Sequence, residues 1–222
     1  SDPLGAEGKY TDPVLLRNGQ STQFYGYCTD IYFGGALDFV DEAVAEEKPF
    51  LVYLPMNCPH GPFDDAPKAL YEMYRKKDLS LSQFSNGVGL SLPADTEASL
   101  DKRAKIFAMI TNIDENVGRI RAYLEESGQL ENTIIIYTSD QGMYVGEHGL
   151  FDKRLGLDPA MRMPLIIRYP KQIAAGSVHD ALINNVDYAE TILDMTGAPI
   201  PASMQGFSFW GLATEQGDWN RR

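Results

Sequence analysis

Apolar side chains recur every three or four positions along two stretches of the chain, as on the buried face of a helix. The longer stretch covers residues 100–126, and Gly128 follows it as a stop signal. The shorter one predicts a helix that Thr29 or Asp30 caps and that runs to about Glu46. The stripe of the longer helix consists of Ile106, Ile110, Ile113, Val117, Ile120 and Leu124.

Three short aliphatic runs alternate with helical segments and predict strands. They cover residues 50–56, 133–139 and 164–169. Asn18-Gly19 lies between two apolar runs, which is a strong signal for a β-hairpin. Because helices alternate with buried aliphatic strands, the pattern predicts an α/β layered domain. Its three strands are expected to share one mostly parallel sheet, against which the two long helices pack.

The remaining segments are shorter or less regular. Residues 64–77 predict a short polar helix, and residues 80–96 predict a loop of Ser, Gly, Leu and Pro. Asp187 with Glu190 predicts the start of another helix through a capping box, and Gly197 predicts its end. The chain shows no internal repeat, so the pattern fits one large α/β domain.

Composition excludes several classes of function. The formal net charge is −12 over 222 residues, which argues against nucleic-acid binding because a phosphate backbone needs a basic face. Hydrophobic residues make up 44% of the chain, enough for a substantial core. Cys28 and Cys58 form no metal motif or disulfide framework and are expected to be free buried thiols. No run approaches the roughly 20 apolar residues of a membrane span.

The densest chemistry follows the strand expected at residues 133–139. Asp140 and Gln141 come at its carboxyl end, where an α/β sheet presents its ligands. A glycine-rich loop then carries His148 and Lys153. Carboxylate and amide oxygens suit a hard divalent cation, whereas lysine and histidine suit an anion. The pattern therefore indicates a metal together with a sulfate or phosphate ester.

Six segments, in this order, carry a family resemblance that extends over nearly the whole chain. They are G-Y-C-T-D at 26–30, K-P-F-L-V-Y-L-P-M-N-C-P-H-G-P-F at 48–63, I-T-N-I-D-E-N-V-G-R-I at 110–120, N-T-I-I-I-Y-T-S-D-Q-G at 132–142, G-E-H-G-L-F-D-K at 146–153 and M-R-M-P-L-I-I-R-Y-P at 161–170. With them the chain resembles the type I sulfatases, arylsulfatase-like members of the alkaline phosphatase superfamily. The resemblance implies an alkaline-phosphatase-like α/β domain with a mostly parallel central sheet flanked by helices.

The resemblance also implies roles for five residues. Asp140 and Gln141 would ligate a metal ion, with Ca²⁺ as the expected cofactor, although relatives usually carry Asn or His at the second position. Lys153 precedes Pro164 by eleven residues, as the family's sulfate-contacting lysine does. His60 matches the family's substrate-side histidine, and His148 is expected near the sulfate. Together they imply a sulfuric ester hydrolase that acts on a carbohydrate or aryl sulfate.

One family feature is absent from the sequence. Type I sulfatases form a formylglycine nucleophile from Cys or Ser in a C/S-x-P-S-R motif, and neither Cys28 nor Cys58 lies in such a motif. The resemblance therefore implies that residues 1–222 are part of a sulfatase catalytic domain. The nucleophile-bearing N-terminal part and the C-terminal subdomain are expected outside this chain. We expect the chain alone to be inactive.

Other interpretations stay open. A phosphodiesterase or phosphonate monoester hydrolase of the same superfamily uses similar metal chemistry, and a non-catalytic sulfate- or glycan-binding descendant would also lack the nucleophile. The resemblance implies a periplasmic or secreted location. His179 is expected on the surface, Arg162 is expected to anchor its loop to the sheet, and helix capping explains Asp187. The sequence does not indicate the oligomeric state.

Overall fold

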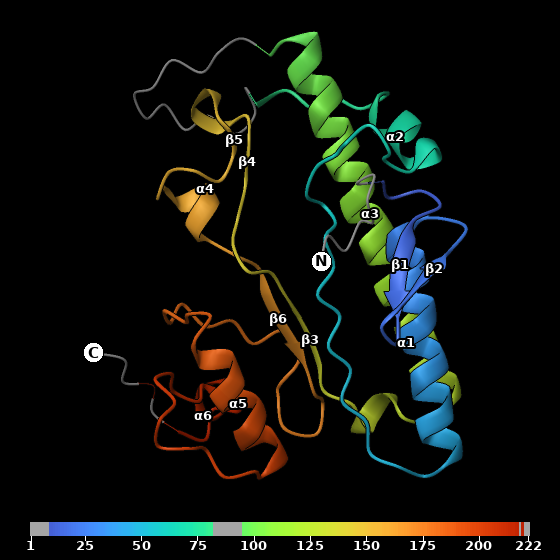
Figure 1. The fold of residues 1–222 in the computed structure, drawn as a ribbon. Helices are drawn as coiled ribbons and strands as arrows, with labels where there is room; N and C mark the ends of the chain where they lie inside the picture. The colour runs from blue at the N-terminus through green and yellow to red at the C-terminus, as the bar shows by residue number, and fades with distance from the viewer. Residues whose placement is uncertain (1–8, 82–94, 218, 220–222) are drawn as a thin grey trace. The chain divides into compact units, whose positions relative to one another are not determined.

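The computed structural model describes residues 9–81, 95–217 and 219. The chain divides into two compact units, one of residues 1–128 with 143–152 and one of residues 129–142 with 153–222 (Figure 1). Most of the expected loop at 80–96 lies outside the described residues. Among the described residues, no helix is both long enough and apolar enough to cross a membrane.

Two long helices, α1 (Cys28–Ala45) and α3 (Glu97–Glu126), lie side by side in the first unit. Their buried faces are mostly apolar, although α3 also buries Arg103, Asn112 and Asn116, and the short helix α2 (Lys68–Tyr74) packs on α3.

Both long helices were predicted. Of the predicted stripe of α3, Ile106, Ile113 and Leu124 are buried, whereas Val117 and Ile120 are half-buried and Ile110 is 40% exposed. The core of the helix pair includes the buried side chains of Phe33 and Val40 from α1 and of Ile106, Met109 and Ile113 from α3.

The helix starts differ from the predicted ones. Tyr27 is the N-cap of α1 and makes no side-chain cap, so the prediction of Thr29 or Asp30 is wrong. The carboxylate of Asp30 instead accepts hydrogen bonds from the amides of Asn112 (2.9 Å) and Asn116 (2.6 Å) on α3. The Asp30 carboxylate thus bonds the neighbouring helix instead of capping its own.

Helix α3 starts at Glu97, three residues earlier than predicted. Thr96 and Ser99 form a reciprocal capping box, in which each side chain accepts from the other residue's backbone N–H. Serine does here what Glu or Gln does in the usual pattern, so the sequence signal was easy to overlook.

The N-terminal hairpin is confirmed. Strands β1 (Val14–Arg17) and β2 (Gln20–Gln23) pair antiparallel around Asn18 and Gly19. Both turn residues have positive φ, 53° and 80°, as the turn that matches strand twist requires.

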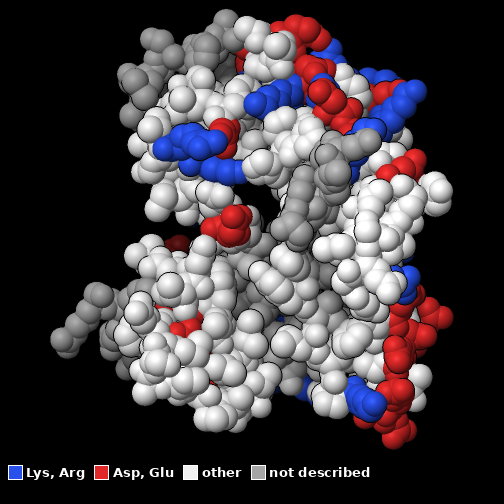
Figure 2. All heavy atoms as spheres, viewed as in Figure 1, with Lys and Arg blue, Asp and Glu red and all other residues white. Residues whose placement is uncertain are grey.

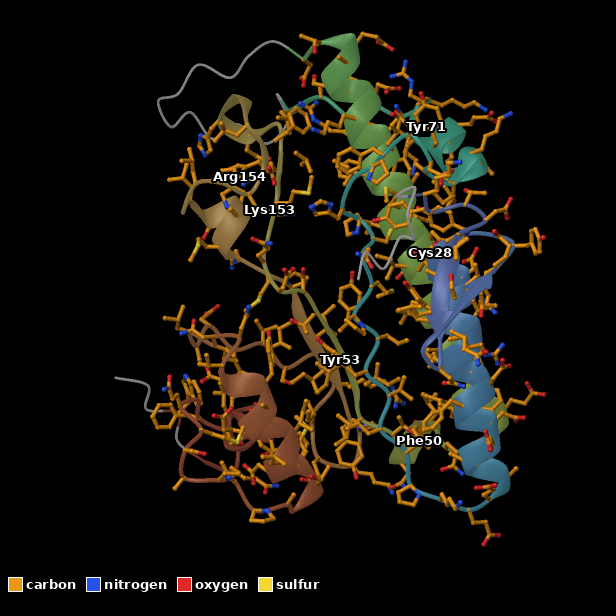
Figure 3. The ribbon with its side chains drawn as sticks, in the orientation of Figure 1. Cys28, Phe50, Tyr53, Tyr71, Lys153 and Arg154 are labelled. Carbon is orange, nitrogen blue, oxygen red and sulfur yellow. The ribbon has the colours of Figure 1, made fainter. Side chains whose placement is uncertain are left out.

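Residues 50–56 are not a buried strand, which corrects the prediction. Leu51 is 72% exposed and Tyr53 is 83% exposed, while Phe50, Val52 and Leu54, which alternate with them, are half-buried. Figure 3 shows the extended path between Phe50 and Tyr53. The alternation is that of a strand, but no described strand forms a ladder with this segment. An apolar run becomes a strand only when its backbone groups find a partner.

The second unit is built on strands β3 (Ile135–Thr138) and β6 (Leu165–Arg168). They pair antiparallel, with Ile136 opposite Ile167, so the prediction that they run parallel is wrong. A parallel pair needs a crossover connection, usually a helix. The connection from β3 to β6 contains a short hairpin and, as its only α-helix, the four-residue helix α4 (Asp158–Met161), and the chain returns beside β3 in the opposite direction. The described strands form three two-stranded antiparallel sheets.

Helix α5 (Asp187–Thr196) ends at Gly197, as predicted, and this glycine has φ 70°. The short helix α6 (Trp210–Ala213) follows. The N-cap of α5 is Val186, so Asp187 is not the cap. The carboxylate of Asp187 accepts instead from the backbone N–H groups of Asn184 and Phe207.

The first unit carries a concentration of acidic side chains on α1. Figure 2 shows them over the end of this helix. They agree with the argument against nucleic-acid binding, since a polyanion would meet like charge there. The exposed residues concerned are Asp38, Asp41, Glu42 and Glu46.

Candidate functional site

A tight turn follows β3 and carries the two expected metal ligands. Asp140 is exposed and Gln141 is half-buried. The hydroxyl of Ser139 donates to the carbonyl of Gln141 at 2.9 Å and so closes the turn. Gly142 then donates its N–H to the carbonyl of Ala160 at 2.9 Å.

The close approach at Gly142 requires glycine. A Cβ at this position would overlap the carbonyl oxygen of Pro159 and would lie 2.8 Å from that of Arg162. The turn is therefore pressed against α4 and the residue that follows it, and a side chain at position 142 would force the two apart.

Asp140 and Gln141 fit a hard cation as part of its ligand set. The amide nitrogen of Gln141 lies 3.3 Å from Oδ2 of Asp140, so the two side chains end close together. Which end of the amide faces the carboxylate is an assignment, and the oxygen would face a bound cation. Calcium takes six to eight oxygen ligands, so these two would be a minority of them. The described residues contain no group of three or more His, Cys, Asp or Glu placed to hold a metal.

His148 lies in a short hairpin of the first unit. Strands β4 (Tyr144–Val145) and β5 (Phe151–Asp152) pair antiparallel, and the short 3₁₀ helix η3 (Glu147–Gly149) joins them. His148 is in the left-handed region, with φ 55° and ψ 19°. This conformation is strained for a residue with a Cβ, and strain of this kind gathers at functional loops. The imidazole packs edge-on against the buried ring of Tyr144, with 6.4 Å between the ring centroids.

A buried arginine on α3 holds this hairpin. Arg103 is 2% exposed, and its guanidinium donates to the carbonyls of Val145 (2.7 Å) and Leu79 (2.8 Å). It also forms an ion pair with Asp95. Gly146, with φ 125°, lets the hairpin approach the guanidinium, because a Cβ there would overlap it. The carbonyl of Val145, three residues before His148, is thus bonded to a buried side chain of α3.

Lys153 follows β5 directly and opens the part of the second unit that leads to α4. It is half-buried, whereas the neighbouring Arg154 is exposed (Figure 3). In the first unit, the ammonium of Lys102 lies 4.5 Å from the centre of the Phe151 ring, a cation–π contact that covers the strand before Lys153.

His60 is exposed, in a loop tied down by its backbone. The hydroxyl of buried Tyr10 donates to the carbonyl of His60 at 2.8 Å. The thiol of Cys58 lies 3.5 Å from the carbonyl of Met109 on α3, as a donor to it. Burial raises the pKa of Cys58 to about 11 and also raises that of Cys28, so both thiols stay protonated. Both cysteines are free and buried, as predicted.

The structure brings together only part of the expected site. Asp140 and Gln141 are adjacent in the second unit, and Lys153 belongs to the same unit. His60 and His148 belong to the first unit. The convergence of all five residues stays a prediction. His179 is exposed, as expected. Arg162 does not anchor its loop to the sheet, since its side chain is 80% exposed and lies 3.8 Å from Asp158.

Sequence reasoning missed three residues that hold these loops: Arg103, Gly142 and Asn185. Arg103 lies three positions before Ile106, in line with the apolar stripe of α3, and a cation in such a place was an available signal. Gly142 was visible only as a turn glycine. The amide of Asn185 donates to the carbonyl of Asp140 at 2.7 Å, across 45 residues, for which no local pattern exists.

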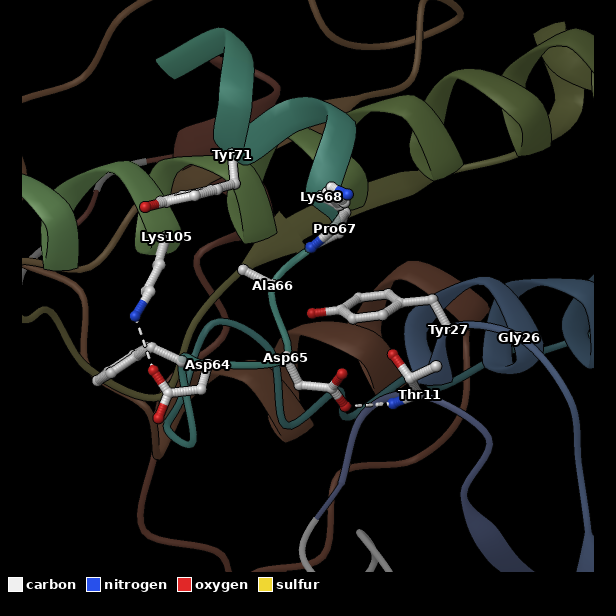
Figure 4. A pocket seen from close by; sticks show the side chains of 11 residues that line it. Thr11, Gly26, Tyr27, Asp64, Asp65, Ala66, Pro67, Lys68, Tyr71 and Lys105 are labelled. Atoms are coloured by element: carbon white, nitrogen blue, oxygen red, sulfur yellow. Dashed lines mark hydrogen bonds and ion pairs between the residues drawn. The ribbon is translucent and has the colours of Figure 1, made fainter. Parts of the chain in front are cut away.

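A cavity of about 540 Å³ lies in the first unit beside the segment that follows His60 (Figure 4). Lys105 lines it and pairs with Asp64 (2.7 Å) and Asp101 (3.0 Å). These carboxylates raise the pKa of Lys105, so its charge is kept but compensated. Asp65 accepts from the backbone N–H of Thr11 at 2.5 Å. The ammonium of Lys105 is thus paired with two carboxylates, which makes the cavity a poor place for a sulfate.

Comparison with known proteins gives a consistent result. The family model described as Sulfatase matches residues 6–198. An N-acetylglucosamine-6-O-sulfatase of Bacteroides thetaiotaomicron is 30% identical, with 97% of this chain and 52% of that protein covered. This chain spans about half the length of that curated relative.

Solved structures agree. A protein in complex with its substrate D-glucosamine-2-N,6-O-disulfate matches with a TM-score of 0.80 and 29% identity, over 98% of this chain and 59% of that one. A phosphonate monoester hydrolase of Silicibacter pomeroyi matches with a TM-score of 0.53 and 29% identity, over 80% and 34%. The alkaline-phosphatase-like α/β class predicted from the sequence is confirmed.

Proposed function

Since this chain belongs to the sulfatase family, we propose that the complete protein is a sulfatase that releases sulfate from a sulfated carbohydrate. By the complete protein we mean the whole gene product that carries this chain. Support for the sugar comes from the relatives, one of which is named for N-acetylglucosamine 6-O-sulfate and one of which is bound to a disulfated glucosamine. An aryl sulfate is the simplest surrogate substrate.

The observation that carries the proposal is the pair of oxygen donors on the turn after β3. Asp140 is exposed and ends beside Gln141, as a metal-binding turn requires. We propose calcium as the ion. When bound, it would neutralise sulfate oxygens and lower the pKa of the attacking group. Gly142 and α4 hold the turn in place so that the two side chains stay oriented.

The cationic and imidazole side chains handle the leaving group in this proposal. Lys153 places a positive charge where the bridging oxygen becomes negative as the S–O bond breaks. His60 or His148 donates a proton to the departing alcohol. His148 is well suited to a fixed role, because its backbone is clamped between β4 and β5.

In this proposal neither cysteine of the chain is the nucleophile. Cys28 and Cys58 are buried, and the raised pKa of both thiols leaves them protonated at neutral pH. We therefore propose that a formylglycine, contributed by a segment outside residues 1–222, attacks the sulfur. The two units would then be parts of one sulfatase catalytic domain. A periplasmic or secreted location is part of the same proposal.

Replacement of Lys153 tests the proposal. In the complete protein, Lys153→Ala should lower kcat on an aryl sulfate about 10²–10³-fold, with less change in KM, because the lost charge acts mainly in the transition state. Lys153→Arg should not restore kcat, since a planar guanidinium does not fit a point-charge site. Lys171→Ala is the matched control, because that lysine lies in the same unit and bonds Asn132. Unchanged kcat in Lys153→Ala would reduce Lys153 to an ordinary loop residue.

A second candidate is a phosphonate monoester hydrolase, favoured by the similarity to the Silicibacter pomeroyi enzyme. Parallel assays with a sulfate ester and a phosphonate ester of the same alcohol separate the two. We expect the higher kcat/KM for the sulfate ester. A higher value for the phosphonate ester would favour the second candidate. Turnover of neither ester, together with binding of sulfated sugar, would identify a non-catalytic descendant.

A further inference from the structure

The start of α5 reaches the turn that carries Asp140. The side-chain amide of Asn185 donates to the backbone carbonyl of Asp140 at 2.7 Å. Three residues further, the hydroxyl of Tyr188 lies 2.8 Å from that of Thr138, the last residue of β3. Two side chains of one short segment thus bond the residues on both sides of Ser139, one at a side-chain hydroxyl and one at a backbone carbonyl.

The segment that bears Asn185 and Tyr188 is itself fixed. Asp187, fully buried, accepts from the N–H groups of Asn184 (2.8 Å) and Phe207 (3.0 Å). One turn later, buried Glu190 accepts from the N–H of Gly206 at 2.6 Å.

Aromatic packing adds to this support. The ring of Tyr188 stands edge-on to that of buried Phe209, with 5.7 Å between centroids. The N–H of Phe209 donates to the hydroxyl of Thr191 at 3.0 Å. The buried side of α5 therefore holds residues 206–209, and this leaves Asn185 and Tyr188 on a rigid support.

The bond from Asn185 acts at the peptide that joins the two proposed ligands. The carbonyl of Asp140 belongs to the peptide group between Asp140 and Gln141. A donor at 2.7 Å restrains the plane of that group, and with it the directions in which the two side chains leave the backbone. Chelation by neighbouring residues depends on those directions, because both oxygens must face one ion.

We propose that Asn185, supported by Tyr188, is a positioning residue that orients the Asp140–Gln141 turn for calcium. The proposal rests on the proposed function, which makes these two residues metal ligands. Neither Asn185 nor Tyr188 touches the ion or the substrate in this proposal.

Exposure separates this role from a merely structural one. Asn185 and Asp140 are both exposed, so water replaces the lost bond readily and its contribution to folding is small. Partners that orient a metal ligand nevertheless alter affinity about 10–100-fold when removed. Asn185→Ala should therefore change calcium affinity much more than thermal stability.

The experiment titrates calcium alone into the chelator-treated complete protein and measures its dissociation constant by calorimetry. We expect Asn185→Ala to raise that constant at least 10-fold while Tm moves by less than about 2 °C. Asn132→Ala is the matched control. It removes an exposed bond of 2.6 Å, to Lys171, at the opposite end of β3. This control should leave the dissociation constant unchanged.

A cycle of Tyr188→Phe and Thr138→Val tests the supporting contact. Each variant removes one hydroxyl of the same bond, so the double variant should bind calcium about as well as either single variant. Additive losses would mean that the two hydroxyls act separately and would remove Tyr188 from the proposal.

Failure of this inference is distinguishable from failure of the proposed function. If Asp140→Ala abolishes calcium binding but Asn185→Ala behaves like Asn132→Ala, the ligand assignment stands and the positioning role is refuted. If Asp140→Ala leaves calcium binding unchanged, both the ligand assignment and the positioning role are refuted.

Discussion

The loop that carries His148 and the turn that carries Asp140 are held in place by different means. The His148 loop is tied through Arg103, a charged side chain that is 2% exposed and bonds two carbonyls and a carboxylate. The Asp140 turn is held by the close approach at Gly142 and by the exposed amide of Asn185.

The difference shows where mutations should take effect. A buried guanidinium leaves unpaired polar groups in the core when it is removed, so damage near His148 should appear first as lost stability. When an exposed turn loses one hydrogen bond, water replaces it and the free energy of unfolding changes little. Substitutions near Asp140 should therefore lower the calcium affinity first. The following changes test this contrast, from the largest expected effect to the smallest.

Arg103→Ala should have the largest effect on stability. We expect a loss of about 3–5 kcal/mol in the free energy of unfolding, because Asp95 and the carbonyls of Val145 and Leu79 lose their partner. Urea denaturation of the complete protein measures it. Arg121→Ala on the same helix is the control, since that side chain is exposed and lies 3.8 Å from Glu125. The control should lose less than about 0.5 kcal/mol. Equal losses in both variants would contradict the role of Arg103.

Gly142→Ala should disturb the turn from within. The added Cβ meets the carbonyls of Pro159 and Arg162, so the backbone must shift at a cost of about 1–3 kcal/mol. Calcium affinity should fall with it, in contrast to Arg103→Ala. Gly156→Ala is the control, because nothing lies within 4 Å of its added Cβ. Thermal denaturation and calcium titration of both variants check the expectation. An unaffected Gly142→Ala protein would show that the turn is not pressed against α4.

The His60 loop, tied to α3 through Cys58, should make the protein sensitive to alkali. Burial raises the pKa of Cys58 from 9.0 to about 11, so the unfolded chain loses this proton at lower pH than the folded one. Its contribution is complete below pH 9 and is lost as pH rises towards 11, by at most about 2–3 kcal/mol. Urea midpoints between pH 8 and 11 measure the loss. Cys58→Ala should flatten the profile, and an unchanged profile would refute the assignment to Cys58.

The strain at His148 gives the smallest predicted effect. With φ 55° the position favours glycine, so His148→Gly should be about 1 kcal/mol more stable than His148→Ala. Chemical denaturation of the two variants measures the difference, since neither retains the imidazole. Equal stability would mean that the loop relaxes once the ring is removed, and that Arg103 does not hold it in the observed conformation.

Much of the fold could be predicted because its signals are local. The two long helices, the Asn18-Gly19 turn and the stop at Gly197 each depend on a few neighbouring residues, and all are confirmed. The prediction of a buried strand at 50–56 was wrong, because strand formation depends on a partner far away in the sequence. The prediction that β6 runs parallel to β3 was wrong because the connection between them contains no long crossover helix.

The candidate site divides in the same way. Asp140 and Gln141 could be chosen from their place after an aliphatic run and from family resemblance. The residues that hold them could not, since Asn185 lies 45 positions from Asp140 and Arg103 lies 42 from Val145. Asp30 and Asp187 were assigned to helix caps, but contacts with Asn112 and Phe207 take their carboxylates. The hydrogen bonds of such side chains depend on residues far away in the sequence, and a local sequence pattern does not include those residues.

The most direct test of the central claim is a crystal structure of the complete protein grown with calcium and a sulfate ester. We predict that a carboxylate oxygen of Asp140 and the amide oxygen of Gln141 lie about 2.3–2.6 Å from the ion. The ammonium of Lys153 should lie about 3 Å from a sulfate oxygen. A calcium ion bound without Asp140 and Gln141, or a sulfate ester beyond the reach of Lys153, would contradict the account.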